Sequence, residues 1–238
     1  GHWVGELSTS ALSTATAVSA LTLVTRHSSN KFGNLQPLID QGVHWLAEHQ
    51  NADGGWGDTD KSYSNIATTM LGIAALHLAG QTDKLPTTLR DAQTYVDKQG
   101  GIAGLRRRYG KDKTFAVPIL TNAALADIVP WSEVSPLPFE MACLPQAWYR
   151  FMRLPVVSYA IPALVAIGQA RYFHRKPRNL FTRLVRAASV RRSLRVLRRM
   201  QPESGGYLEA VPLTSFVVMS LAATGRSGHT VARNGVKF

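Results

Sequence analysis

Two stretches of the sequence determine how the chain is organised: LAEHQNADGGWGDTD at residues 46–60 and LRRMQPESGGYLEAV at residues 197–211. Each ends a helix-like run in a glycine-rich loop that carries one aromatic residue. They share one spacing, in which a glutamine is followed by a glycine and then by an aromatic residue. The matching residues are Gln50, Gly54 and Trp56 in the first copy, and Gln201, Gly205 and Tyr207 in the second. This repetition predicts a fold of stacked repeats.

The first copy extends upstream of its glutamine. Gly42 and Trp45 precede Gln50 there, and Gly235 and Phe238 show the same Gly-x-x-aromatic spacing at the other end of the chain. The sequence therefore predicts that the chain stops inside a repeat. Since stacked repeats need neighbours and terminal caps, we expect the chain to be a fragment of something longer.

Apolar residues recur three and four positions apart, as at Ile66, Met70 and Ile73. This is the period of a helix, and no convincing run shows the alternation of a strand. The sequence therefore predicts an all-α fold. We expect Pro162 to kink its helix and Pro212 to occupy a first turn. The expected helices cover residues 9–25, 35–49, 65–79, 86–98, 115–127, 139–147, 156–170, 180–200 and 212–224, and a turn is expected at QGGIAG, residues 99–104.

The residue types of the repeat suggest a structural role. A glutamine at a helix end can offer its amide to exposed carbonyls, and the glycines allow a tight turn. The aromatic residue can then stack over that glutamine. We therefore interpret Trp56 as a residue that pins a loop between outer helices, and a contact with substrate is the alternative.

The net charge of +12 is concentrated in one part of the chain. Residues 171–199 hold 11 Arg and Lys and no Asp or Glu, which leaves 16 basic residues against 15 acidic ones elsewhere. The apolar positions of this stretch also change face: Leu180 and Leu184 lie nearly opposite Leu194 and Leu197 on a helix. One straight helix would not bury both faces, so we expect a break near residues 187–189.

Residues 171–188 allow three interpretations. They are a solvated charged face, a nucleic-acid-binding arm, or an interfacial helix whose apolar face is rimmed by arginine. The interleaved aromatic and apolar residues favour a membrane surface with anionic lipid as the partner, and we expect no nucleic acid to bind. The candidates for a membrane-facing substrate channel are Tyr172, Phe173, Phe181, Leu184, Arg183 and Arg186.

The pattern Gly-x-x-Trp-Leu-x3-Gln-x3-Gly-x-Trp at residues 42–56 resembles the QW motif of the squalene-hopene cyclase and oxidosqualene cyclase family. These enzymes are the class II triterpene cyclases. The opening GHWVGELSTSALSTATAV and residues 137–173 are similar to that family as well, in the same order. The resemblance implies an (α/α) barrel of inner and outer helices, a polyprenoid ligand such as squalene, and peripheral, monotopic attachment to a membrane from the cytoplasm.

The resemblance also implies a division of the chain. Residues 1–34 would be a helix of the neighbouring catalytic barrel, and residues 35–238 would form the α/α-barrel domain with 171–188 as its membrane-facing segment. The family protonates an alkene with an Asp-x-Asp-Asp motif, without metal or cofactor. This chain has no such motif, and we interpret Asp58 and Asp60 as a solvated loop or helix-cap pair. We therefore predict no catalytic residue in this chain.

Two segments depart from the family pattern. After Tyr207 the chain reads LEAVPLTS, where the family carries Gly-Gly and Ile-Gln-Pro, and residues 154–160 lack its Trp-Ala-Arg. These departures favour a divergent cyclase, with a different polyprenoid or a scaffold role. The candidates for the cavity wall are Tyr159, Val211 and Pro212.

The cysteine and histidine content argues against a metal site. Cys143 is the single cysteine, so an intramolecular disulfide is excluded and the zinc site of the related protein prenyltransferases lacks its ligands. The leading hypothesis is the N-terminal half of a squalene-hopene-cyclase-like enzyme. The rival is a non-catalytic α/α-barrel module that binds lipid or a partner protein. The sequence leaves a homodimer open.

Overall fold

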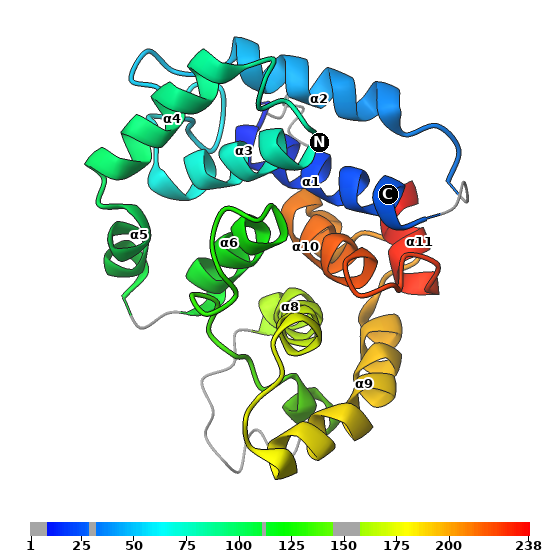
Figure 1. Ribbon diagram of the computed structural model, residues 1–238. Coiled ribbons are helices and arrows are strands. Elements are labelled where there is room, and N and C mark those ends of the chain that lie inside the picture. The colour runs from blue at the N-terminus through cyan, green and yellow to red at the C-terminus, as the bar shows by residue number, and fades with distance from the viewer. Residues whose placement is uncertain (1–8, 29–31, 111–112, 145–157) are drawn as a thin grey trace, which may run out of the picture.

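The computed structural model describes residues 9–28, 32–110, 113–144 and 158–238. Within these ranges the chain forms helices and no strand, which confirms the all-α prediction. Figure 1 shows helices arranged around a centre in two layers, an inner ring and an outer layer. The opening residues 1–8 and most of residues 154–160, on which part of the family resemblance rests, lie outside the described residues.

Five helices of the described chain form the inner ring. Helix α1 contacts α3 and α10, α3 contacts α6, α6 contacts α8, and α8 contacts α10, which closes the ring (Figure 1). These helices are apolar nearly all round because both their inward and outward faces are covered, and in α3 every residue except His77 is buried. Their bounds are α1 Ala11–His27, α3 Ile66–Leu78, α6 Lys113–Leu125, α8 Ile161–His174 and α10 Val211–Ala222.

The outer layer consists of amphipathic helices. Helix α2 packs on α1, α4 on α3, α11 on α10, and α9 with η1 on α8. An inner ring covered by outer helices is the arrangement expected of an α/α barrel. The outer elements are α2 Gln36–Glu48, α4 Pro86–Lys98, α5 Gly101–Tyr109, α9 Leu180–Met200 and α11 Thr230–Lys237, with the short 3-10 helices η1 Phe139–Cys143, η2 Ser158–Ala160 and η3 Tyr207–Glu209.

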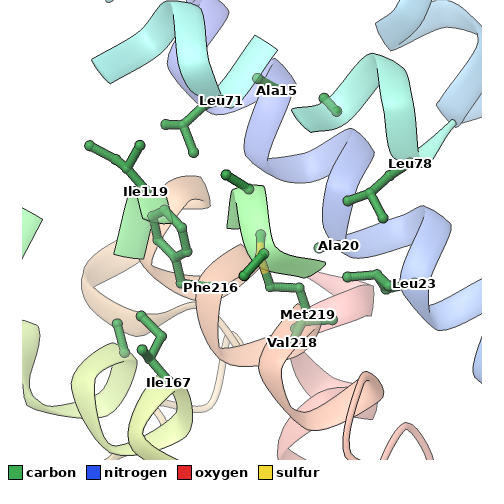
Figure 2. Packing of buried hydrophobic residues seen from close by; sticks show 14 of the residues in the cluster. Ala15, Ala20, Leu23, Leu71, Leu78, Ile119, Ile167, Phe216, Val218 and Met219 are labelled. Carbon is green, nitrogen blue, oxygen red and sulfur yellow. The ribbon is translucent and has the colours of Figure 1, made fainter. Parts of the chain in front are cut away.

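The core lies inside the ring and receives side chains from every inner helix. Leu23, Leu71, Ile119, Ile167 and Met219 are all buried there, one from each helix of the ring (Figure 2). Burying a side chain of this size contributes about 1.5–3 kcal/mol. The shared core therefore holds the five inner helices together as one body.

Helix α1 is an integral part of this ring. Asn122 Nδ2 on α6 donates a hydrogen bond to Ser19 Oγ on α1 at 3.1 Å, and Ser227 Oγ donates to the carbonyl of His27 at 3.0 Å. Residues 1–34 were expected to belong to a neighbouring barrel. In this structure α1 packs between α3 and α10 of the ring, and the assignment of residues 1–34 to a second barrel stays a prediction.

Three local predictions also differ from the structure. Residues 101–109 form α5 where a turn was expected, because Gly100, at φ +89°, reverses the chain within one residue after α4. Pro162 lies in the first turn of α8 and does not kink it, since a first-turn proline lacks only an amide hydrogen that would be unpaired anyway. Helix α9 runs unbroken through residues 187–189, because its first half is exposed and does not have to bury its apolar face.

Candidate functional site

The two glutamines of the repeat make the same pair of hydrogen bonds. Gln50 Nε2 donates to the carbonyl of Gly54 at 2.7 Å and to that of Thr88 at 2.9 Å. Gln201 Nε2 donates to the carbonyls of Gly205 at 2.9 Å and Val231 at 3.0 Å. Each glutamine thus ties its own loop to the first turn of the next outer helix, α4 or α11.

The two aromatic residues of the repeat are buried in the wall between inner and outer helices. Trp56 is fully buried, and its Nε1 donates to the carbonyl of Leu46 at 2.9 Å. The Tyr207 hydroxyl donates to the carbonyl of Leu197 at 2.8 Å, and burial raises the pKa of Tyr207. Neither ring lines the cavity described below, so both positions suit the structural interpretation.

The glycines of the repeat lie where the backbone or a neighbouring helix leaves no room for a side chain. Gly54 and Gly205 have φ of +86° and +90°, and a Cβ at Gly54 would lie 2.5 Å from the carbonyl oxygen of Asp91. Gly42 lets α2 approach Val18 on α1, since a Cβ there would lie 2.5 Å from a methyl group of Val18. Gly42 therefore sets the approach of α2 to α1, whereas Gly54 and Gly205 let their loops lie close to the outer helices α4 and α11.

Trp45 differs from Trp56 in its surroundings. It lies on α2 at the partly buried edge of the core, and its ring stacks on His49 with centroids 4.1 Å apart. The His49 Nδ1 lies 2.9 Å from the Trp45 carbonyl oxygen, which fixes the stacked pair at the end of the helix. This geometry stabilises the last turn of α2.

An apolar cavity of about 320 Å³ opens at one end of the ring. Its lining comes from the N-terminal half of every inner helix, with Leu12 on α1, Leu71 on α3, Ile119 on α6, Leu164 on α8 and Phe216 on α10. The wall is apolar because these positions continue the inward faces of the helices. All five inner helices contribute to this one space.

Two of the three residues predicted for the cavity wall line this space, and the third does not. Tyr159 and Pro212 line it, whereas Val211 does not and is partly exposed. Sequence reasoning missed three aromatic residues of the lining: Tyr109, Phe115 and Phe216. The rings of Tyr109 and Phe115 stack with centroids 5.5 Å apart. The signal that could have found Phe115 was its place on the inward face of α6, one turn before Ile119.

Asp58 lies at the rim of the cavity as an exposed carboxylate. Its Oδ1 accepts hydrogen bonds from Thr68 Oγ1 at 2.6 Å and from Asn65 Nδ2 at 2.8 Å, and Asn65 is the N-cap of α3. An anion at this end of a helix is favoured by the helix dipole. The geometry agrees with a loop or cap role and is unlike the dry, isolated acid that alkene protonation needs.

The basic segment presents an apolar surface at the start of α9. Leu180, Phe181 and Leu184 are 71%, 75% and 69% exposed, and Phe173 at the end of α8 is also exposed. Arg183 is exposed among them. Large apolar side chains grouped in this way on a surface are typical of an interaction site.

Two residues proposed for this surface are placed elsewhere. Arg186 was expected to reach lipid phosphates, but it is buried, and its Nε lies 3.1 Å from both carboxylate oxygens of Glu140. Tyr172 is half-buried: its ring packs against Phe139 and its hydroxyl donates to the Arg183 carbonyl at 3.1 Å. Glu140 of η1 therefore holds Arg186 away from the rim, and Tyr172, expected to supply apolar surface, exposes only part of its side chain.

Within the described ranges, no helix is both long and apolar enough to cross a membrane. The same part of the chain holds no group of three or more His, Cys, Asp or Glu residues that could bind a metal ion. Cys143 is half-buried, with Sγ 3.7 Å from the Ser189 carbonyl oxygen, and burial raises the pKa of its thiol. A raised thiol pKa disfavours the nucleophilic thiolate.

Residues 1–180 match the family described as the squalene-hopene cyclase N-terminal domain. The chain belongs to this family. The resemblance noted from the QW-like pattern is thereby confirmed at the level of the family.

Two curated relatives are also cyclase-related proteins. The chain is 28% identical over 175 residues to a terpene cyclase-glycosyl transferase fusion protein of Humicola fuscoatra, covering 72% of this chain and 12% of that protein. It is 28% identical over 169 residues to alpha-onocerin synthase of Lycopodium clavatum, covering 66% of this chain and 20% of that protein. The chain thus spans no more than a fifth of the length of these relatives.

Proposed function

We propose that this chain is the barrel-forming N-terminal part of a class II terpene cyclase and supplies one wall of a polyprenoid cavity. The observation that carries the proposal is the apolar space to which all five inner helices contribute, in a chain of the squalene-hopene cyclase N-terminal domain family. In this proposal the acid that starts proton-initiated cyclisation comes from a part of the protein outside this sequence.

The chemistry of the cavity wall suits a hydrocarbon ligand. The lining is almost wholly apolar, and its charged member, Asp58, is hydrogen-bonded at the rim. Tyr109, Phe115, Tyr159 and Phe216 add aromatic rings, whose faces attract a cation. A volume of about 320 Å³ is near the lower end of ligand pockets, so the wall would enclose one part of a polyprenoid chain.

We also propose that the exposed start of α9 rests on an anionic membrane surface as a peripheral contact. Leu180, Phe181 and Leu184 would enter the interface, and Arg183 would lie at its edge. Squalene-like hydrocarbons are almost insoluble in water, so an enzyme that uses them gains by taking them directly from a bilayer. Hopanoid formation and the identity of the polyprenoid follow from the family alone and are part of this proposal.

Binding of squalene to the purified chain tests the cavity. Squalene in detergent micelles is incubated with the protein, and the bound fraction is extracted after gel filtration and measured by gas chromatography. Phe115→Asp places a charge in the lining and should weaken binding by about tenfold or more, because a charge next to a hydrocarbon is poorly solvated. The matched control is Tyr63→Asp, at a fully exposed aromatic residue outside the lining, and should bind like the unaltered chain.

Two results would contradict the proposal. Equal squalene binding by the Phe115→Asp and Tyr63→Asp variants would show that squalene does not bind in the cavity. Formation of cyclised product by this chain alone, abolished by Asp60→Asn, would show that the acid lies within it. The rival, a non-catalytic module that binds lipid, is favoured if the protein's natural reading frame carries no Asp-x-Asp-Asp motif beyond Phe238.

A further inference from the structure

One buried hydrogen bond crosses the inside of the ring. Asn122 Nδ2 on α6 donates to Ser19 Oγ on α1 at 3.1 Å, and both side chains are fully buried. Helix α3 lies between α1 and α6 in the ring, so the bond runs across the interior. Ser19 Oγ donates its own proton to the Ala15 carbonyl at 3.0 Å, so toward Asn122 it can only accept. The amide nitrogen of Asn122 therefore faces Ser19, and its amide oxygen is left over.

Two buried polar atoms on the inner helices have no hydrogen-bond partner among the described residues. They are Asn122 Oδ1 on α6 and Ser220 Oγ on α10, and both residues are fully buried. Burying such a group without a partner is unfavourable, and an apolar residue of similar shape would fill each position without that cost. The two atoms therefore indicate a binding partner that the protein itself does not supply.

Both residues lie at the inner end of the apolar cavity. Asn122 follows Pro118 by four residues on α6, and Ser220 follows Phe216 by four residues on α10. Pro118 and Phe216 line the cavity, and Figure 2 shows Phe216 inside the ring. Residues four apart share one face of a helix, with the second about 6 Å further along its axis. Asn122 and Ser220 therefore continue the inward faces of their helices one turn beyond the lining.

The donor and acceptor properties of the two groups select a ligand. A hydroxyl group satisfies both, because its proton can be donated to Asn122 Oδ1 while its oxygen accepts the proton of Ser220 Oγ. A carboxylate or phosphate has no proton to offer to Asn122 Oδ1, so two acceptors would face each other. A plain hydrocarbon would leave both protein atoms unpaired. The wall above them is almost wholly apolar, so the rest of the ligand must be apolar as well.

We propose that the cavity takes a polyprenoid alcohol, whose hydroxyl group is held by Asn122 and Ser220 at the inner end. The apolar chain would extend along the wall that Phe115 and Phe216 help to form, toward the mouth of the cavity. This inference deepens the proposed function and rests on its claim that a polyprenoid occupies this space. It adds a preference, since a site built to hydrogen-bond a hydroxyl group disfavours the analogue that lacks it.

Binding of farnesol, compared with the hydrocarbon that lacks only its hydroxyl group, tests the inference. Each probe is presented in detergent micelles, and the bound fraction is extracted after gel filtration and measured by gas chromatography. The unaltered chain should bind the alcohol about tenfold more tightly, because only the alcohol pairs with both buried groups. Farnesyl methyl ether keeps the oxygen but has no proton to donate, so it should lose the contribution of Asn122.

Two variants remove the polar groups one at a time. Ser220→Ala deletes a hydroxyl group that has no partner among the described residues, so the fold should be retained. Asn122→Leu replaces the amide by an apolar group of similar shape, and Ser19 Oγ keeps its bond to the Ala15 carbonyl. Each variant should reduce the preference for the alcohol about threefold to tenfold without weakening hydrocarbon binding.

The matched control is Thr121→Val, which removes a buried hydroxyl group on a different face of α6. This hydroxyl already donates to the Val117 carbonyl at 2.7 Å, so the preference for the alcohol should be unchanged. Circular dichroism checks that each variant is folded.

The outcomes separate this inference from the proposed function. Binding of neither probe, nor of squalene, would overturn both. Equal affinities of the unaltered chain for alcohol and hydrocarbon would show that the polar groups hold a buried water only, which overturns the inference and leaves the proposed function in place. A preference for the alcohol that survives both Ser220→Ala and Asn122→Leu would place the hydroxyl group elsewhere and would also overturn the inference.

Discussion

Trp56 and Tyr207 make equivalent hydrogen bonds in the two copies of the repeat. Trp56 Nε1 donates to the Leu46 carbonyl at 2.9 Å, and the Tyr207 hydroxyl donates to the Leu197 carbonyl at 2.8 Å, each acceptor ten residues upstream. Each acceptor lies in the last turn of an outer helix, where carbonyls depend on partners beyond the helix, and the Leu197 carbonyl also accepts the amide of the C-cap Gln201. The aromatic residue thus caps one helix while its ring fills the space behind the inner layer.

Trp56→Ala should lower the free energy of unfolding by about 3–5 kcal/mol, as expected for aromatic truncation at a fully buried site. Tyr207→Phe keeps the ring and removes only the hydrogen bond, so its cost should be about 1 kcal/mol. Urea denaturation followed by circular dichroism measures both values. An unchanged free energy of unfolding for Trp56→Ala would show that the ring is not a structural element.

Gly54→Ala and Gly80→Ala separate backbone strain from steric overlap. Both glycines have positive φ, but a Cβ at Gly80 would meet nothing within 4 Å, whereas at Gly54 it would lie 2.5 Å from the Asp91 carbonyl oxygen. Gly80→Ala should therefore lose about 1–2 kcal/mol of stability through its left-handed conformation alone. Gly54→Ala should lose about 1–3 kcal/mol more through overlap with α4. Equal losses in urea denaturation would mean that the close approach is unimportant.

Tyr207 should make the protein sensitive to alkaline pH. Burial raises the pKa of Tyr207 above its value in the unfolded chain, which is about 10. The folded state then holds the phenolic proton more tightly, so this stabilisation is complete below about pH 10 and is lost as pH rises above it. The free energy of unfolding should fall between about pH 10 and 12 in the unaltered chain and fall less in Tyr207→Phe. The same slope in both proteins would contradict the prediction.

The sequence was most informative at the repeat, where a glutamine, a glycine and an aromatic residue recur at the same spacing. The glutamine and glycine positions predicted hydrogen bonds to exposed carbonyls and a tight turn, but they did not predict that both rings also donate a hydrogen bond to a helix-end carbonyl. Spacing along the chain does not reveal partners from distant segments. Arg186 was assigned to the surface because Glu140, 46 residues away, was not visible as its partner.

The cavity and the position of α1 were hidden for the same reason. Tyr159 and Pro212 were found through departures from a family pattern, but Phe115 lines the same space through an inward face that the ring alone defines. The apolar sequence of α1 does not reveal which helices it packs against. Its contacts with α3 and α10 place it in the inner ring of this chain. The lining of the cavity and the neighbours of α1 therefore depend on contacts between distant segments, which the spacing of apolar residues does not reveal.

Removing one partner of the Arg186–Glu140 pair should destabilise the start of α9. Their side chains are only 10% and 19% exposed, so Glu140→Gln would leave a nearly buried guanidinium without its carboxylate. The expected loss is about 3–5 kcal/mol, and the double variant Glu140→Gln/Arg186→Met should recover part of it because no buried charge remains. Thermal unfolding of the single and double variants measures this. A double variant less stable than Glu140→Gln would contradict the argument.

The exposed start of α9 provides the last prediction. Phe181→Ser with Leu184→Ser should reduce flotation with anionic vesicles even at high salt, because it removes apolar area that salt does not screen. Lys176→Gln with Arg183→Gln should reduce only the salt-sensitive part, since exposed charges act over a Debye length of about 8 Å at physiological ionic strength.

The matched control is Leu38→Ser, at an exposed leucine of α2 outside this surface, and it should float like the unaltered chain. Each basic group near anionic lipid contributes about 1 kcal/mol, so the two charge substitutions should weaken binding by one to two powers of ten at low salt. The apolar pair should lower binding at every salt concentration, which a purely electrostatic surface would not do. If the chain does not float at all, or prefers DNA to anionic lipid at about 150 mM salt, the first half of α9 is not a membrane contact and a nucleic-acid surface becomes the better explanation of its charge.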